Sequence, residues 1–247
     1  MKGGFPVAQM RLDKFLSDAG IATRRELKMI IKSGRVSLDG STETRPEAKL
    51  DPERARVLLD GEPVSYSEYR YYMLYKPAGV LTATEDRDQK TVLDLLSPEM
   101  RRMGLFPVGR LDKDTSGLLL LTNDGDFAHR VISPRFSVEK CYYAEVDGNI
   151  DQNDIKAFAD GIELRDGLRC RPSKLERLGE NSCLVHLTEG KYHQVRRMLA
   201  SRGKPVIKLK RLSIGALELD SALGPGEYRE LDGDDLCRVF MSHSMEK

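Results

Sequence analysis

Apolar residues near the start of the chain recur at the spacing of two short amphipathic helices. The buried face of the first predicted helix consists of Leu12, Phe15, Leu16 and Ala19. We expect this helix to end at Gly20 and a second helix to begin after Thr23, because Glu26 follows Thr23 by three residues, as in a capping box. The second helix is predicted to end at Gly34 and to bury Leu27, Ile30 and Ile31.

Short strands and tight turns follow these helices. The predicted strands are Val36–Leu38 and Val57–Leu59. Each is followed by an Asp-Gly pair, which is typical of a two-residue hairpin turn; the pairs are Asp39-Gly40 and Asp60-Gly61. Two helices combined with such strands make a small folding unit, which we place at residues 10–65.

The remaining chain divides into a flexible leader (residues 1–9), a polar linker (66–70) and a larger domain (71–247). Strands in the larger domain are predicted at Tyr72–Leu74, Phe106–Val108, Gly117–Thr122, Lys140–Val146, Cys183–Leu187, Ile207–Leu209 and Tyr228–Leu231. Helices are predicted at Thr91–Leu96, Gly125–Ile132, Asp151–Ala159 and Tyr192–Ser201. Irregular alternation of strands and helices favours an α+β fold with a mixed, mostly antiparallel sheet and flanking helices.

Composition excludes several classes of protein. The chain has 247 residues, 40% of them hydrophobic and 32% charged, as in ordinary globular domains. The longest apolar run, Leu118–Leu121, is far too short for a membrane span, and residues 1–9 lack the apolar core of a signal peptide, so we expect a cytoplasmic protein. The four cysteines are widely scattered, which predicts neither a metal site nor a disulfide.

The net charge of +1 conceals an uneven distribution of charge. Residues 10–35 carry seven basic and three acidic side chains, and residues 190–212 carry eight basic side chains and no acidic one. Residues 218–247 carry eight acidic and three basic side chains. Two basic segments offset by an acidic tail are consistent with a surface that faces a polyanion, although solvated helix faces give the same pattern.

The run from Gly109 to Gly117 lies between two apolar strands and contains Asp112 and Asp114. Strand ends can hold such a loop rigidly, so that a carboxylate is fixed at a sheet edge. Aspartates in polar turns also commonly bond their own backbone. The local pattern leaves the catalytic and the structural interpretation open.

A second run, from Glu189 to Met198, follows a predicted strand and opens a helix. Helical periodicity places Arg196 beside the apolar face and Arg197 toward solvent. A guanidinium at the edge of a buried face needs a carboxylate partner, because an unpaired charge there is costly. His193 has no accompanying serine or cysteine motif, so we favour an RNA-contacting or structural role for it over that of a base.

These residues resemble a known family. The run from Gly109 to Leu119 closely resembles the catalytic-loop signature of pseudouridine synthases, and the run from Glu189 to Met198 resembles a second signature in its RsuA-type variant. Further matches occur in the expected order at Tyr75-Lys76-Pro77-Ala78-Gly79, where the family usually begins with asparagine, at Glu139–Tyr142 and at Gly224–Arg229. Residues 10–61 resemble the S-four-like RNA-binding domain. The resemblance spans nearly the whole chain from Met10 to Phe240.

The resemblance implies roles at matching positions. Asp112 is expected to be the essential carboxylate, Tyr142 to stack on the extruded base and assist proton removal, and Arg196 to pair with Asp112. Arg110 is expected to fill the gap left in the RNA by the extruded uridine. The other expected substrate-binding residues are Lys76, Lys191, His193 and Arg197. Isomerisation of uridine requires no cofactor, no redox change and no metal.

The implied partner is ribosomal RNA or an assembly intermediate of a ribosomal subunit, bound by a monomer. We favour small-subunit (16S) RNA as the target, and large-subunit (23S) RNA is the alternative. Phosphates are expected to contact the basic residues of the small domain: Arg11, Lys14, Arg24, Arg25, Lys28, Lys32 and Arg35.

Two other functions fit parts of the sequence. Asp112-Lys113-Asp114-Thr115 resembles the nucleophile loop of haloacid-dehalogenase-type phosphatases, but Arg110-Leu111 is not the apolar strand end that usually precedes it. A non-catalytic RNA-binding protein needs only the two basic segments. The combined presence of Asp112, Tyr142 and Arg196 favours an enzyme.

Overall fold

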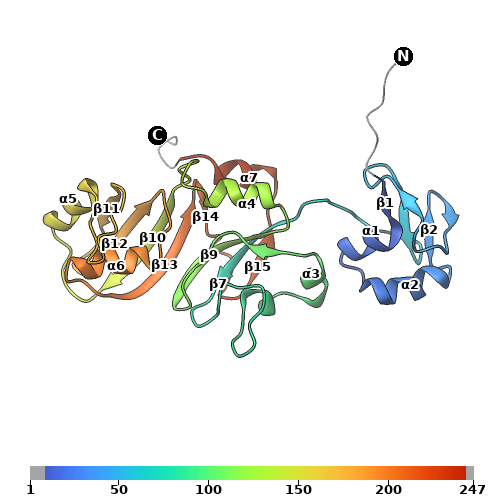
Figure 1. The fold of residues 1–247 in the computed structure, drawn as a ribbon, viewed down its shortest axis with the longest axis horizontal. Coiled ribbons are helices and arrows are strands. Elements are labelled where there is room, and N and C mark those ends of the chain that lie inside the picture. Colours follow the sequence, from blue (N-terminus) through green and yellow to red (C-terminus); the bar gives the residue numbers. More distant parts are fainter. Residues whose placement is uncertain (1–8, 243–247) are drawn as a thin grey trace, which may run out of the picture. The chain divides into compact units, whose positions relative to one another are not determined.

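The computed structural model describes residues 9–242, which form two compact units (Figure 1). The first unit comprises the chain up to Arg70 together with Leu96–Leu105, and the second comprises Tyr71–Leu95 and the chain from Phe106 onward. The expected leader lies outside the described residues, except for residue 9. No helix in residues 9–242 is long and apolar enough to cross a membrane.

The first unit contains both helices predicted near the start of the chain. Its helices are α1 (Leu12–Asp18), α2 (Arg24–Lys32) and α3 (Pro98–Arg102). Its strands are β1 (Met10–Arg11), β2 (Val36–Leu38), β3 (Ser41–Thr42), β4 (Lys49–Leu50), β5 (Val57–Leu59) and β6 (Glu62–Pro63). Strands β3-β2-β5-β6 form one antiparallel sheet, and β1 pairs with β4. Positive φ angles at all four residues of the two Asp-Gly turns confirm the predicted tight hairpins.

The predicted capping box begins α2. The Thr23 hydroxyl accepts a hydrogen bond from the Glu26 amide at 3.3 Å, and the Glu26 carboxylate accepts one from the Thr23 amide at 2.9 Å. Leu27 and Ile31 are buried as expected, whereas Ile30 is only partly buried. Tyr66, in the segment interpreted as a linker, stacks its ring on Phe15 with 4.7 Å between centroids.

The second unit is built on one nine-stranded sheet. Its strands are β7 (Tyr71–Lys76), β8 (Phe106–Pro107), β9 (Thr115–Thr122), β10 (Lys140–Val146), β11 (Lys174–Arg177), β12 (Ser182–Leu187), β13 (Val206–Ile214), β14 (Leu217–Glu218) and β15 (Tyr228–Glu230). The order is β11-β12-β10-β13-β9-β7-β15, with β8 paired to β9 and β14 to β13. Among these strands only β9 and β13 pair in parallel, so the predicted α+β fold with a mixed, mostly antiparallel sheet is confirmed.

Helices cover the sheet in two groups that create two apolar cores. These helices are α4 (Gly125–Ile132), α5 (Gln152–Asp160), α6 (Gln194–Ser201) and α7 (Gly233–Val239). In Figure 1, α4 and α7 lie beside each other, and the edge-on contact of Phe127 with Phe240, 5.6 Å between centroids, joins them. Helices α5 and α6 flank the part of the sheet formed by β10, β11 and β12. Phe158 and Met198 belong to one core, and Phe127 and Val239 to the other.

The structure corrects several predicted elements. The helix expected at Thr91–Leu96 is a single 3-10 turn, η1 (Val92–Leu95), and α6 begins at Gln194, two residues later than predicted. Strand β13 continues to Ile214, well past the predicted end at Leu209, because the buried residues Leu209, Arg211 and Ser213 alternate with less buried ones along it. The prediction also missed α3, α7, β11 and β14, which are all short and carry little periodicity.

Gly117 permits an unusually close approach of β13 to β9. It lies opposite Arg211 in the parallel register and has φ of +112°. A Cβ atom added to Gly117 would lie 2.1 Å from the carbonyl oxygen of Arg211, closer than any real Cβ contact. Only glycine fits this position, and the loop signature therefore ends in a residue that sets the spacing between these two strands.

We predict that Gly117→Ala lowers the free energy of unfolding by about 3 kcal/mol, because the new methyl group adds backbone strain and pushes β13 away from β9. Urea denaturation of the full chain measures this change. The matched control is Gly125→Ala at the first residue of α4, where an added Cβ meets nothing within 4 Å. The prediction fails if the two variants are equally stable.

Candidate active site

A cavity of about 910 Å³ opens on the second unit. Its lining comes from the loop Gly109–Lys113, from β10 and β13, and from the segment Glu189–Val195. The lining also includes members of both apolar cores, such as Val195 from one and Val131 from the other. A cavity of this volume is large enough for a nucleotide.

Buried Lys76 holds the loop that carries Asp112. The side chain of Lys76 is fully buried at the end of β7. Its ammonium donates hydrogen bonds to four backbone carbonyls, those of Pro77 (3.0 Å), Asp112 (3.2 Å), Lys113 (3.1 Å) and Thr115 (2.8 Å). Burial lowers the pKa of Lys76 from 10.5 to about 8. All of these donor directions point to backbone carbonyls, and Lys76 is absent from the cavity lining among the described residues, so in this structure the side chain is placed to hold the loop.

A threonine fixes the other side of the same loop. The buried hydroxyl of Thr82 donates to the carbonyl of Leu111 at 2.8 Å and accepts from the Leu111 amide at 3.2 Å. Because Lys76 holds the carbonyls of Asp112 and Lys113, the loop is tied on both sides of the Asp112 side chain, by the last residue of β7 and by a residue that follows β7. The Asp112 carboxylate forms no hydrogen bond within the loop among the described residues. This observation disfavours the structural interpretation, in which Asp112 only stabilises a turn.

The Asp112 carboxylate faces two cationic or ionisable side chains from another part of the chain. It is 31% exposed, with Oδ1 at 3.5 Å from His193 Nε2 and Oδ2 at 3.8 Å from Arg196 Nε. Arg196 also donates to the carbonyls of Val206 (3.3 Å) and Asp114 (3.4 Å). The structure thus brings Asp112, His193 and Arg196 together, and the contact of Asp112 with Arg196 is the one that the family resemblance implies.

Arg197 differs from its predicted environment. Its side chain is 28% exposed, close to the 25% of Arg196, because it forms an ion pair with Asp166 at 2.5 Å. Arg197 is absent from the cavity lining among the described residues. Arg110, by contrast, is exposed and lines the cavity.

The floor of the cavity is cationic. Tyr142 and Lys140 project from β10, and Arg211 projects from β13, where it is the register partner of Tyr142. The Lys140 ammonium donates to the carbonyls of Val131 and Val138, both at 2.8 Å. Burial, together with the nearby charge of Arg211, lowers the pKa of Lys140 to about 8. The Arg211 Nη1 atom lies 3.5 Å from the Tyr142 hydroxyl.

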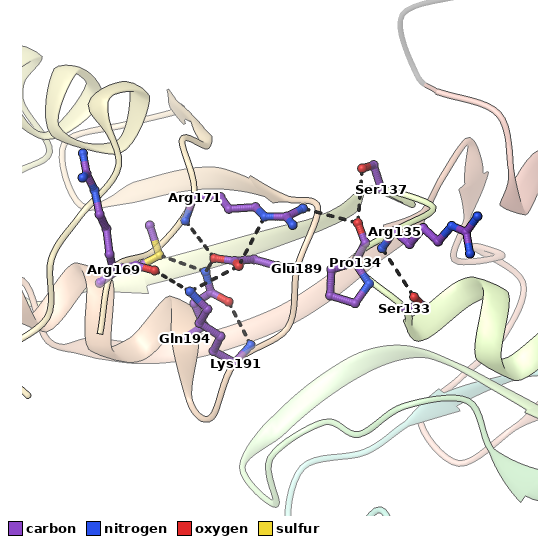
Figure 2. A network of polar contacts seen from close by, with 10 residues as sticks. Ser133, Pro134, Arg135, Ser137, Arg169, Arg171, Glu189, Lys191 and Gln194 are labelled. Carbon is purple, nitrogen blue, oxygen red and sulfur yellow. Dashed lines mark hydrogen bonds and ion pairs between the residues drawn. The ribbon is translucent and has the colours of Figure 1, made fainter. Parts of the chain in front are cut away.

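A buried glutamate organises the segment before α6 (Figure 2). Glu189 accepts hydrogen bonds from the Arg171 amide (2.9 Å) and from Gln194 Nε2 (2.7 Å), and its other oxygen lies 3.3 Å from the Lys191 ammonium. Burial opposes ionisation of Glu189, but these hydrogen bonds outweigh it and lower the pKa of the carboxyl. Lys191 also donates to the carbonyl of Arg169, so its ammonium is largely engaged by protein groups.

His193 stands at a sharp bend immediately before α6. Its φ of 49° and ψ of 35° place it in the left-handed region, and Tyr192 stacks on its ring with 3.9 Å between centroids. Tyr192 is largely exposed at the cavity. This conformation aims the His193 imidazole at Asp112 and leaves an aromatic surface facing solvent.

The seven basic residues predicted in the first unit fall into two groups. Arg11, Lys14 and Arg35 form ion pairs with Asp13 (2.8 Å), Asp18 (2.5 Å) and Asp60 (2.5 Å). The other four are exposed and have no ion pair with any residue that the structure describes: Arg24, Arg25, Lys28 and Lys32. Of these seven residues, only the four on α2 present cations that no described residue neutralises.

Sequence reasoning did not single out Thr82, Lys140, Glu189 or Arg211 as site residues. The signal for Arg211 was present, because it shares the phase of the buried residues Leu209 and Ser213 in β13. Thr82 gives no such signal, since a lone threonine in a loop has no periodic partner. No group of three or more metal-ligating side chains occurs within residues 9–242.

Comparison with known proteins places the chain among RNA-modifying enzymes. The family model for RNA pseudouridylate synthase matches residues 70–201, and that for the S4 domain, the S-four-like domain expected from the sequence, matches residues 10–55. The uncharacterized RNA pseudouridine synthase YtzG of Bacillus subtilis is 46% identical over 92% of this chain and 97% of its own length. Ribosomal small subunit pseudouridine synthase A of Vibrio cholerae is 41% identical over 94% of this chain and 100% of its own.

A solved structure shows the same fold. A crystal structure of a pseudouridylate synthase superimposes with a TM-score of 0.67 at 33% sequence identity, over 93% of this chain and 99% of that one.

We predict that Lys76→Met lowers the free energy of unfolding by about 3 kcal/mol, because four backbone carbonyls lose the buried ammonium that donates to them. Urea denaturation measures the loss, and the control is Lys113→Met, an exposed lysine of the same loop, with an expected change below about 0.5 kcal/mol. Equal stability of the two variants would contradict the role assigned to Lys76.

A comparison of wild type with Lys76→Met at different pH values tests the lowered pKa of Lys76. Between the folded value of about 8 and the ordinary value of 10.5, the unfolded chain binds more protons at this residue than the folded chain. The contribution of Lys76 to wild-type stability therefore rises with pH in this window, and Lys76→Met lacks that rise. We expect the difference in free energy of unfolding between wild type and Lys76→Met to be larger at about pH 9.5 than at about pH 7.5.

Proposed function

Because the chain belongs to the RNA pseudouridylate synthase family, we propose that it isomerises one uridine of small-subunit ribosomal RNA to pseudouridine, with Asp112 as the catalytic carboxylate. The observation that carries the proposal is the position of Asp112: a loop tied down on both flanks presents its carboxylate to a nucleotide-sized cavity. The names of relatives such as the Vibrio cholerae enzyme support the small subunit as the source of the RNA.

The reaction needs a carboxylate at the sugar. Isomerisation breaks the bond from C1′ to N1, turns the detached uracil, and joins C1′ to C5. The sugar becomes electron-poor when the first bond breaks, and an ionised carboxylate can stabilise it by charge or by a covalent bond. In this proposal Asp112 does so, while Arg196, 3.8 Å away, holds the carboxylate in position.

Tyr142 and Arg110 are proposed to handle the extruded nucleotide. A uridine must leave its stack before C1′ can reach Asp112, at a cost of a few kcal/mol. The ring of Tyr142 lies in the cavity beside Arg211 and offers a stacking surface for the base. Arg110 is exposed at the cavity, in a position to fill the gap left in the RNA.

His193, Lys191 and Arg197 receive revised roles in the proposal. His193 contacts the sugar or assists the orientation of Asp112, since its Nε2 lies 3.5 Å from that carboxylate. Lys191 and Arg197 are engaged by Glu189 and Asp166, so we assign them to shaping the segment around α6.

The first unit is proposed to bind phosphates through α2. Four exposed basic side chains on a single helix, free of ion pairs with any described residue, form a cationic strip of the kind that contacts an RNA backbone. Arg11, Lys14 and Arg35 are already neutralised within the unit and contribute less.

Asp112→Asn is expected to abolish isomerisation while binding to RNA persists, because the amide keeps the shape of the side chain but lacks its charge. The assay uses ribosomal RNA from cells lacking the protein and measures pseudouridine formation and binding in parallel. The control is Asp114→Asn in the same loop, whose side chain is exposed and does not line the cavity among the described residues. Conversion by Asp112→Asn at the wild-type rate would falsify the assignment.

Replacing Arg24, Arg25, Lys28 and Lys32 together by glutamine should weaken RNA binding and reduce its salt dependence. Each lost phosphate contact lowers the slope of log affinity against log salt by about 0.7 to 0.9. The matched control is the triple variant Arg11→Gln, Lys14→Gln and Arg35→Gln, which removes paired cations and should change the slope less. Similar slopes for wild type and the quadruple variant would exclude α2 as the contact surface.

A further inference from the structure

Arg211 is a buried cation at the floor of the candidate active-site cavity. Its side chain is 4% exposed, and it lines the cavity beside Tyr142 and Leu209. The missing side chain of Gly117 on β9 makes room for β13 at this point. The position of Arg211 at the floor of the cavity therefore depends on Gly117.

The hydrogen-bonding capacity of Arg211 is mostly unused. A guanidinium has five N–H donors. The Nε atom donates to the carbonyl of Leu118 at 2.8 Å, and Nη1 has one long contact with the Tyr142 hydroxyl at 3.5 Å. Nη2 is buried and has no acceptor among the described residues. The bond of Nε ties β13 to β9, and the remaining donors make no hydrogen bond shorter than 3.5 Å to any described residue.

The charge of Arg211 also lacks a partner. No carboxylate lies within 4.0 Å of it among residues 9–242, although a buried charge is costly without one. Lys140, which shares the cavity floor, has its pKa lowered partly by the charge of Arg211. A cavity floor with two cations and no carboxylate attracts an electron-rich group.

The position of Arg211 indicates which part of a nucleotide it meets. Phosphates stay with the RNA strand near the exposed rim, where Arg110 and Tyr192 lie. A buried group beside the ring of Tyr142 is reached by the extruded base itself. The acceptors of uracil are its two carbonyl oxygens, O2 and O4.

We propose that Arg211 is a further catalytic residue, which binds a carbonyl oxygen of the extruded uracil and stabilises the negative charge that develops on the ring when the glycosidic bond breaks. The inference rests on the proposed function and deepens it, because it assigns the group that recognises the departing base.

The reaction in which Arg211 is proposed to act conserves atoms and electrons. When the bond from C1′ to N1 breaks, its electron pair stays on uracil and spreads over N1, O2 and O4, while Asp112 stabilises the sugar. After the ring turns, C5 supplies the electrons of the new bond to C1′. The proton on C5 leaves to a base, and N1 takes up a proton, so substrate and product are isomers. Arg211 acts at the first step, where the ring is most negative.

The test compares wild type with Arg211→Lys on ribosomal RNA from cells lacking the protein. Lysine keeps the charge but loses the forked donors, so we expect kcat to fall by about 100-fold or more, with KM changed less than about threefold. A purely structural role would instead lower stability, so urea denaturation is measured on the same samples. Arg177→Lys is the control: its Nε likewise donates to a backbone carbonyl, but its side chain is exposed on β11 outside the cavity.

Two outcomes separate this inference from the proposed function. If wild type forms no pseudouridine, the proposed function fails whatever Arg211 does. If wild type is active, Asp112→Asn is inactive and folded Arg211→Lys retains the wild-type kcat, only the role of Arg211 is overturned.

If Arg211→Lys does not fold, a crystal structure of wild type bound to RNA tests the role of Arg211 instead. In a crystal of the unaltered protein with an RNA fragment containing its target uridine, a guanidinium nitrogen of Arg211 should lie within about 3.2 Å of O2 or O4. An Arg211 that contacts a phosphate, or no atom of the RNA, overturns the inference.

Discussion

The structure of the site depends on one buried ammonium group. Lys76 donates hydrogen bonds to three carbonyls of the loop that carries Asp112 and to that of its own neighbour Pro77, and in doing so it converts a polar loop into a rigid support. The cost of burying this charge appears in its lowered pKa. Thr82 adds a second tie at Leu111, so the position of Asp112 is set by Lys76 at the end of β7 and by Thr82 beyond it, and not by the loop alone.

The cavity combines charges in an order that suits the proposed reaction. Asp112 lines its side and is paired with Arg196 from α6, and Lys140 and Arg211 lie at its floor. A nucleotide that enters base first would place its sugar beside the carboxylate and its carbonyl oxygens beside the cations. Gly117 contributes to this arrangement because it sets the spacing between the strands that carry the loop and Arg211.

The local elements of the fold and part of the candidate site could be predicted from the sequence. The capping box of α2 and the Asp-Gly turns are local signals, and the structure confirms them. The contact of Asp112 with Arg196 could be predicted only from the family resemblance, since no local pattern joins residues so far apart in the sequence. The burial of Lys76 could not be predicted, because a lysine at a strand end usually reaches solvent and only the folded loop supplies three of its four acceptors. The pairing of Arg197 with Asp166 likewise depends on a loop whose position the sequence does not reveal.

The most direct test of the account is to map pseudouridines in ribosomal RNA from cells that lack this protein, and from the same cells supplied with the wild-type chain or with Asp112→Asn. We expect one pseudouridine of the small-subunit RNA to be missing in cells that lack the protein, to return with wild type and to stay absent with Asp112→Asn. An unchanged set of pseudouridines in cells lacking the protein would contradict the account.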